Sequence, residues 1–175
     1  TDIDLTAASV KTNIIVNSLI GETKSNPLDE NDTKYSIYNY TESYSTNRTG
    51  VCIFEKVISG ISNIKFKDIS ITDTSKSTNA YVNIIRYNYG EMSGIDFSNI
   101  TLNAYNEEYV GPVGINYGQE VHDINLDHMY IDGQDKVAGF IAYAENGEER
   151  KYYNIHGTNL DVRAKNHRVG GIFGA

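Results

Sequence analysis

The chain has 175 residues and a net charge of −8 at pH 7, from 23 acidic and 15 basic side chains. Nucleic acids and anionic membranes bind basic surfaces, so this charge argues against both as partners. The composition, with 15 glycines, 14 tyrosines and two prolines, favours strands and tight turns over helices. No apolar run approaches the roughly eighteen residues of a membrane span.

Residues 1–50 predict an irregular entry region. Apolar segments at 13–16, 18–20 and 34–40 are separated by a polar stretch, 21–33, that we expect to be a loop. Arrays of repeats need atypical terminal units. This region is therefore expected to close one end of a repeat stack in part.

From residue 51 the sequence repeats itself. One eleven-residue block occurs four times, with starts that lie 31, 29 and 31 residues apart. A second, valine-led block recurs between these copies. Self-similarity at this period is typical of a solenoid. The copies of the first block are 61–71, 92–102, 121–131 and 152–162, and the second block begins at Val51, Val82, Val110, Val137 and Val169.

The first block changes its alternation halfway. Ile64 and Phe66 alternate with polar residues, whereas Ile69 and Ile71 alternate on the opposite parity. A parity change without a loop predicts a bend at Lys67–Asp68. Each repeat therefore predicts two short strands that meet at a bend, a variable loop and a third apolar strand. Three strands per rung, stacked on like neighbours, describe an all-β, right-handed parallel β-helix with rungs of about 30 residues.

The register of the repeats predicts columns of side chains along the stack. Short polar residues suit the bends, because they tolerate unusual φ and ψ angles. Gly157 would leave a hole in an inward column of bulky residues. The bend columns are Asn63/Gly94/Asp123/Asn154 and Asp68/Asn99/His128/Asn159, and the inward columns are Ile64/Ile95/Ile124/Ile155, Phe66/Phe97/Leu126/Gly157 and Ile71/Leu102/Ile131/Val162.

We expect one continuous domain, with the entry region at 1–50 and the repeat β-helix at 51–175. The chain stops inside the apolar segment 169–174. Natural domains seldom end in mid-strand, so we interpret the chain as an excised piece of a longer protein. Its β-helix would then be truncated at the C-terminal end, and targeting signals would lie outside it.

Several segments resemble a known family. The segment Val169-Gly-Gly-Ile-Phe-Gly174 resembles the GLUG-type repeat of bacterial surface proteins. Most of the chain resembles the β-helical, non-catalytic region of M26-type zinc metallopeptidases, the IgA1-protease family. The segments that carry this second resemblance are, in order, Asp4-Leu-Thr-Ala-Ala8, Asn13-Ile-Ile15, Lys34-Tyr-Ser-Ile-Tyr-Asn39, Cys52-Ile-Phe54 and 61–71.

The resemblance implies a module of a bacterial protein that is secreted or lies on the cell surface. Such a module spaces or orients a protease domain, or helps to bind a host protein substrate such as an immunoglobulin or another glycoprotein. Its other partners would be adjacent domains of the parent chain. The alternative is a carbohydrate-active β-helix, a lyase or a hydrolase, or an adhesin stalk.

Zinc would belong to the protease domain of the parent protein. Zinc peptidases of this kind use His-Glu-x-x-His on a helix, with two histidines that bind the metal and a glutamate that acts as the base. None of the four histidines here opens that pattern. The segment itself is therefore expected to hold no cofactor and to be no enzyme.

Few residues stand out as parts of a site. Cys52 lies in an apolar run and is expected to be a buried, inert thiol. His122 and His128 flank two aspartates at a strand-like spacing, which does not predict a metal site. We assign no catalytic, cofactor-binding or metal-ligating residue. Because loops and tyrosines often contact partners, the candidate partner-binding residues are Tyr105, Glu107, Glu108, Tyr109 and Tyr153.

Overall fold

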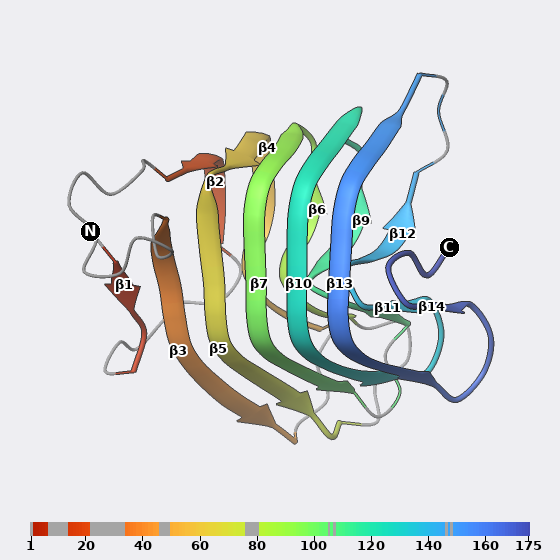
Figure 1. Cartoon of the computed structure of the whole chain (residues 1–175). Helices are drawn as coiled ribbons and strands as arrows, with labels where there is room; N and C mark the ends of the chain where they lie inside the picture. The colour runs from red at the N-terminus through yellow and green to blue at the C-terminus, as the bar shows by residue number, and fades with distance from the viewer. Residues whose placement is uncertain are drawn as a thin grey trace.

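The computed structural model describes residues 2–6, 14–21, 34–45, 50–75, 81–104, 106, 108–145, 147 and 149–175. These residues form the expected parallel β-helix, with about four turns and about 31 residues per rung. The coil is right-handed, as Figure 1 shows. The described part contains no helix that could cross a bilayer.

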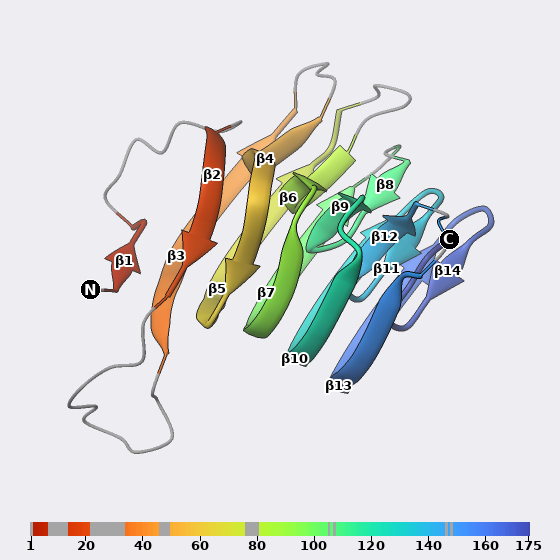
Figure 2. The same ribbon diagram turned by 90° about the horizontal axis from the view of Figure 1, so that it is seen from above.

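Long bent strands form one side of the coil, and the strands of the other side are mostly shorter (Figures 1 and 2). All pairs are parallel. The long strands are β3 (Tyr35–Tyr44), β5 (Ile64–Asp73), β7 (Glu91–Ala104), β10 (Glu120–Gly133) and β13 (Lys151–Ala164). The other side holds β4 (Val51–Ser62), β6 (Tyr81–Asn88), β8 (Tyr109–Val110), β9 (Val113–Asn116), β11 (Val137–Ala138), β12 (Ile141–Ala144) and β14 (Val169–Gly170). In the entry region, β1 (Ile3–Asp4) pairs with β3, and β2 (Ile14–Ile20) pairs with β4.

The sheet register follows the sequence repeat. Phe97 lies between Phe66 and Leu126 on neighbouring strands, as the predicted inward column requires. The five repeated valines also pair from rung to rung in one column. Both repeated blocks therefore stack on their own copies.

The bends lie where the parity change predicts them. All eight predicted bend residues have a positive φ, between 51° and 61°. Asn39, at φ 60°, extends the second bend column into β3. Left-handed backbone is strained for most side chains but is best tolerated by glycine, asparagine and aspartate. Pairing skips the bend residue and resumes in register directly after it, so the two short strands of each repeat form one bent strand.

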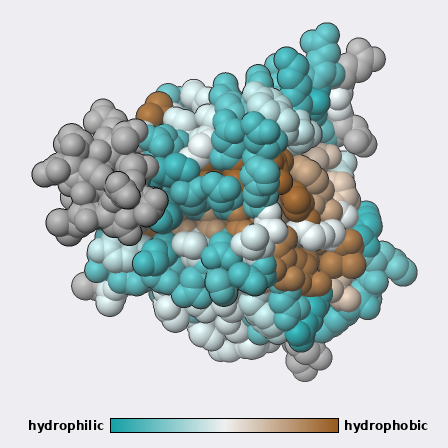
Figure 3. All heavy atoms as spheres, viewed as in Figure 1, coloured by the Kyte–Doolittle hydropathy of each residue, from teal (hydrophilic) through white to brown (hydrophobic). Residues whose placement is uncertain are grey.

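The core fills the inside of the coil. Phe66 and Phe97 are fully buried, and their rings stack with centroids 5.1 Å apart. On β13 the inward residues Ile155 and Val162 are only half-buried, and Gly157 is exposed. The expected hole is not present, because the Leu160 side chain lies 2.6 Å from the position that a Cβ of Gly157 would take. Figure 3 shows the resulting apolar surface on the side of β12, β13 and β14. The last rung is thus less well packed than the rung of β10 that precedes it.

Candidate functional site

The structure separates the candidate partner-binding residues. Tyr105 and Glu107 lie outside the described residues. Glu108 and Tyr109 contact Lys136, one rung further along. Tyr153 lies near the start of β13, in a different network. The described candidates therefore belong to two groups.

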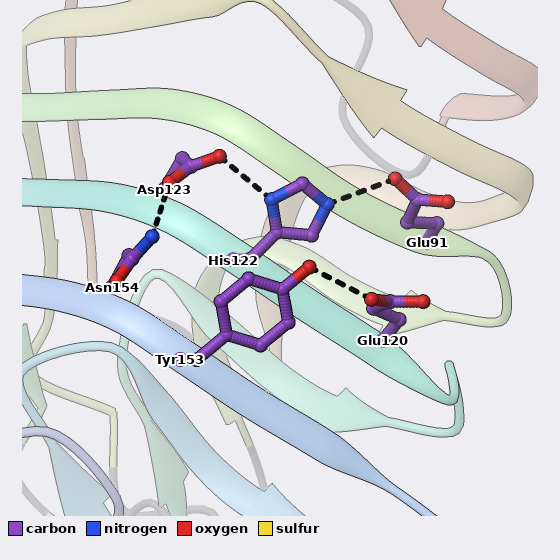
Figure 4. A network of polar contacts seen from close by, with 6 residues as sticks. All are labelled: Glu91, Glu120, His122, Asp123, Tyr153 and Asn154. Atoms are coloured by element: carbon purple, nitrogen blue, oxygen red, sulfur yellow. Dashed lines mark hydrogen bonds and ion pairs between the residues drawn. The ribbon is translucent and has the colours of Figure 1, made fainter.

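Tyr153 belongs to a polar network on the outward surface of β7, β10 and β13 (Figure 4). Its ring lies parallel to that of His122, with centroids 4.8 Å apart, and its hydroxyl donates to Glu120 at 2.8 Å. The ring nitrogens of His122 contact Asp123 at 2.8 Å and Glu91 at 3.2 Å. The network therefore ties three successive rungs together.

Both nitrogens of His122 face carboxylate oxygens. Only the imidazolium form can donate to both acceptors. The hydrogen bond with Asp123, supported by the bond with Glu91, raises the pKa of His122. The same bond, with one from Asn154 at 3.0 Å, lowers the pKa of Asp123. Among the described residues, no three His, Cys, Asp or Glu side chains are arranged to hold a metal ion.

The second group lies on the opposite side of the coil. Register places Tyr87 beside Ile115 and Ile115 beside Tyr143, and it pairs Tyr81 with Tyr109. We call these five residues, which lie on β6, β8, β9 and β12, the tyrosine face. Tyr81 is buried, and the other four are half-buried. The aromatic rings of this face are therefore accessible only in part.

An arginine is held within the tyrosine face. The guanidinium of Arg86 lies 3.6 Å from the centre of the Tyr81 ring and 4.6 Å from that of Tyr87. It donates to Glu55 at 2.7 Å, and the Tyr81 hydroxyl donates to the same carboxylate at 3.2 Å. Burial raises the pKa of Tyr81, so the phenol stays a neutral donor. The Cys52 thiol, fully buried as expected, also contacts Glu55 at 3.5 Å.

A second cation lies beside Tyr109. The Lys136 ammonium is 4.3 Å from the centre of the Tyr109 ring and forms an ion pair with Glu108. Burial alone would lower the pKa of Lys136, but hydrogen bonds with Glu108 and Tyr109 outweigh burial and raise it. The lysine therefore stays charged although it is only 6% exposed.

A cavity of about 50 Å³ opens in the tyrosine face. Asn83 lines it and is fully buried. The Asn83 amide nitrogen donates to the carbonyl oxygens of Tyr109 at 3.3 Å and Gly111 at 2.9 Å. Because both partners are acceptors, the orientation of the amide is fixed. Its Oδ1 atom has no hydrogen-bond partner in the described structure. The lining residues are Tyr81, Asn83, Arg86, Tyr87, Tyr109, Gly114 and Ile115.

Sequence reasoning missed Asn83, Arg86 and Lys136. One signal was available, because Tyr81, Tyr109 and Lys136 each precede a repeated valine by one residue. Equal positions in successive repeats stack, so this spacing predicts the contact between Lys136 and Tyr109. The sequence carried no comparable signal for the position of Arg86.

A larger groove of about 640 Å³ follows the second bend column. Amide and carboxylate groups come from Asn39, Asp68 and Asn99, and hydroxyls come from residues just after the bends. Asn99 donates to Asp68 at 2.6 Å. The groove is polar and includes the acidic Glu42 at its wall.

Comparison of the chain with family models, curated proteins and solved structures finds no match.

Proposed function

We propose that the chain is a non-catalytic β-helix module of a bacterial zinc metallopeptidase of the IgA1-protease type, secreted or on the cell surface. It spaces the protease domain and helps to bind a host protein substrate. The observation that carries the proposal is the tyrosine face, where aromatic rings and two cations are held on a parallel sheet. Tyrosine and arginine dominate the energetics of protein interfaces. Because the rings and the cations are held rigidly on the sheet, less conformational entropy is lost when a partner binds.

The spacer role is supported by the continuity of the ladder. The long strands pair from β3 to β13 without a missing rung. Outward contacts also link rungs, such as Lys34 with Asp96 at 2.8 Å and Thr158 with Asp127 at 2.7 Å. Each rung extends the stack by about 4.8 Å. A stack of this kind resists bending and can hold two attached parts apart.

Binding of host proteins by the purified chain tests the proposal. Immobilised immunoglobulin A and other host glycoproteins are titrated with the chain, and binding is followed by biolayer interferometry. We expect saturable binding that Tyr87→Ala weakens about tenfold, because the ring contributes at the surface of the tyrosine face. Tyr130→Ala, a half-buried tyrosine on β10 outside the tyrosine face, is the matched control and should bind like the wild type. If none of the host proteins binds with a Kd below about 1 mM, the binding role is contradicted.

A carbohydrate-active β-helix, a lyase or a hydrolase, is the second candidate, and a plain adhesin stalk is the other alternative. The polar groove favours it, because Asp68 and Glu42 supply carboxylates beside hydroxyl and amide groups. A lyase would release unsaturated uronates from polyuronate chains, and a hydrolase would release new reducing ends. Either product, lost on Asp68→Asn, would favour this candidate over the peptidase module.

A further inference from the structure

The two ends of the coil have open strand edges. Among the described strands, β13 is paired by β10 alone, and β1 and β2 are each paired on one side only, by β3 and β4. Figure 2 shows β1 and β2 at one end of the stack and β13 and β14 at the other. We call these ends the first rung and the last rung. An open edge presents backbone N–H and C=O groups that can pair with a further strand.

The last rung carries apolar side chains that a further rung would bury. Ile124 and Ile131 lie beneath β13 and are fully buried, whereas Ile155 and Val162, their partners on β13, are half-buried. Val169 is 52% exposed, although the four repeated valines that precede it are fully buried. A strand laid over β13 would therefore remove apolar surface from water, which favours association.

The first rung carries a side chain that fits the last rung. Ile3 is 52% exposed and pairs with Ile37, whose inward column runs through Phe97 to Gly157. If a second copy continues this register beyond β13, its Ile3 lies over Gly157, which has no side chain. The Leu160 side chain lies against Gly157 and offers Ile3 an apolar contact.

The charges of the two rungs determine which ends can meet. Residues 1–44 include seven acidic and three basic side chains, a net charge of −4, whereas residues 149–175 include two acidic and five basic side chains, a net charge of +3. Asp2 and Asp4 are exposed on the first rung, and Lys151 and Arg163 are exposed on the last. Two like ends would therefore repel each other, and unlike ends attract. Contact between unlike ends also keeps all strands parallel, as they are within the coil.

We propose that the last rung of one copy of the chain binds the first rung of a second copy, head to tail, so that β1 continues the ladder beyond β13. The inference goes beyond the proposed function and does not depend on it. The two copies use different surfaces in this contact, so each pair keeps one free rung of either kind. Association is therefore open-ended and does not close at two copies.

Sedimentation velocity of the purified chain tests the inference. At about 1 μM the chain should be monomeric, and the average mass should rise past that of a dimer as the concentration approaches about 1 mM. A monomer over this whole range would overturn the inference. A dimer that adds no further copies would also overturn it, because a closed dimer uses the same surface on both partners.

Two variants test the contact at the level of residues. Ile3→Lys adds a cation to the first rung, where it would face the basic last rung, and Val169→Glu adds a carboxylate to the last rung. Each variant alone should stay monomeric. An equimolar mixture should form dimers and nothing larger, because one intact first rung meets one intact last rung. Ile58→Lys, at a residue of β4 that is 50% exposed and belongs to neither end rung, is the matched control and should associate like the wild type.

Circular dichroism and thermal melts show whether the variants are folded. Both substituted residues are 52% exposed, so their Tm values should stay close to that of the wild type. Asp2→Lys takes the place of Ile3→Lys if the latter does not fold, because Asp2 is also exposed on the first rung. Folded variants that fail to form a dimer when mixed would overturn the inference, as would an equal loss of association in Ile58→Lys.

Discussion

The Oδ1 atom of Asn116 accepts a 2.7 Å hydrogen bond from Nδ2 of Asn88, one rung away, and both residues are fully buried. Each amide also caps its own return turn. Asn88 donates to the Gly90 carbonyl at 2.6 Å, and Asn116 donates to that of Gly118 at 3.1 Å. The ladder therefore pins two successive turns to each other inside the coil.

Asn116→Ala should lower the free energy of unfolding by about 1–3 kcal/mol, because it leaves buried polar groups without partners. Urea unfolding measures the loss. Asn125→Ala, on the exposed surface of β10, is the control and should cost about 0.5 kcal/mol or less. Similar losses for both variants would mean that the ladder adds no stability.

Phe97→Ala should lower the free energy of unfolding by about 3–5 kcal/mol. The ring stacks on Phe66 and lies 5.7 Å from that of Phe140, so its removal leaves a cavity that close-packed neighbours cannot fill. Denaturant melts measure the change, with the exposed Ile58→Ala as the control. A loss below about 1 kcal/mol would show that the inward register is wrong.

Two substitutions at the Asn99 bend can distinguish the effect of backbone strain on stability from the effect of the hydrogen bond. Asn99 has φ 54° and donates to Asp68 at 2.6 Å. Alanine and glycine both remove the hydrogen bond, but alanine alone meets a left-handed penalty of about 1–2 kcal/mol. Asn99→Gly should therefore be more stable than Asn99→Ala.

Ser98 supplies the matched control, because it precedes the bend and is not among the positive-φ residues. There the order should invert, since glycine weakens a strand by about 0.5–1 kcal/mol relative to alanine. The same order at both positions would contradict the role of φ. Thermal melts of the four variants decide between the outcomes.

Much of the fold is predictable because it follows from the order of apolar and polar residues that are neighbours in the sequence. Alternation predicts the inward columns, and the parity change predicts the bends at Asp68 and Asn99. The tyrosine face is harder, because a backbone irregularity interrupts the alternation of β6. The N–H groups of Ile84 and Ile85 both donate to the Pro112 carbonyl, at 3.1 and 2.9 Å.

Because of this irregularity, the alternation of apolar and polar residues could not predict the surface position of Arg86. Arg86 and Tyr87 are adjacent, yet both reach the surface half-buried, which strict alternation forbids. The unpaired Asn83 oxygen could not be predicted either, since it depends on carbonyls that lie 26 and 28 residues further along the chain.

The His122 network predicts a pH-dependent stability. The pKa of His122 is raised in the folded chain, so its contribution is complete below about pH 6.5, the unfolded value, and is lost as pH rises through the folded pKa. Glu91 and Asp123 face the ring nitrogens, and Tyr153 with Glu120 covers the ring face. His122→Gln should therefore lower the Tm more at about pH 6 than at about pH 9.

His156→Gln is the control for this measurement, because the His156 side chain is exposed on β13. Its Tm should stay close to that of the wild type at both pH values. A His122→Gln deficit that is equal at both pH values would mean that the ring contributes through packing on Tyr153 and not through its charge.

Hydrogen exchange should reveal a gradient of stability along the coil. β7 is paired on both sides, by β5 and β10, whereas β13 is paired by β10 alone among the described strands. Ile155 and Val162 are half-buried, but their counterparts Ile124 and Ile131 are fully buried. Opening β13 therefore exposes less new apolar surface and breaks fewer hydrogen bonds than opening β7.

Amides of residues 155–164 should therefore exchange at least about tenfold faster than those of 95–104 under native conditions, which corresponds to about 1.4 kcal/mol of opening free energy. Mass spectrometry of peptic peptides or NMR provides the rates. Peptides from β10, at 124–133, give the internal reference and should exchange at rates between the two. Equal protection in β7 and β13 would show that the coil opens as one cooperative unit, and that the half-buried side chains of the last rung do not weaken it.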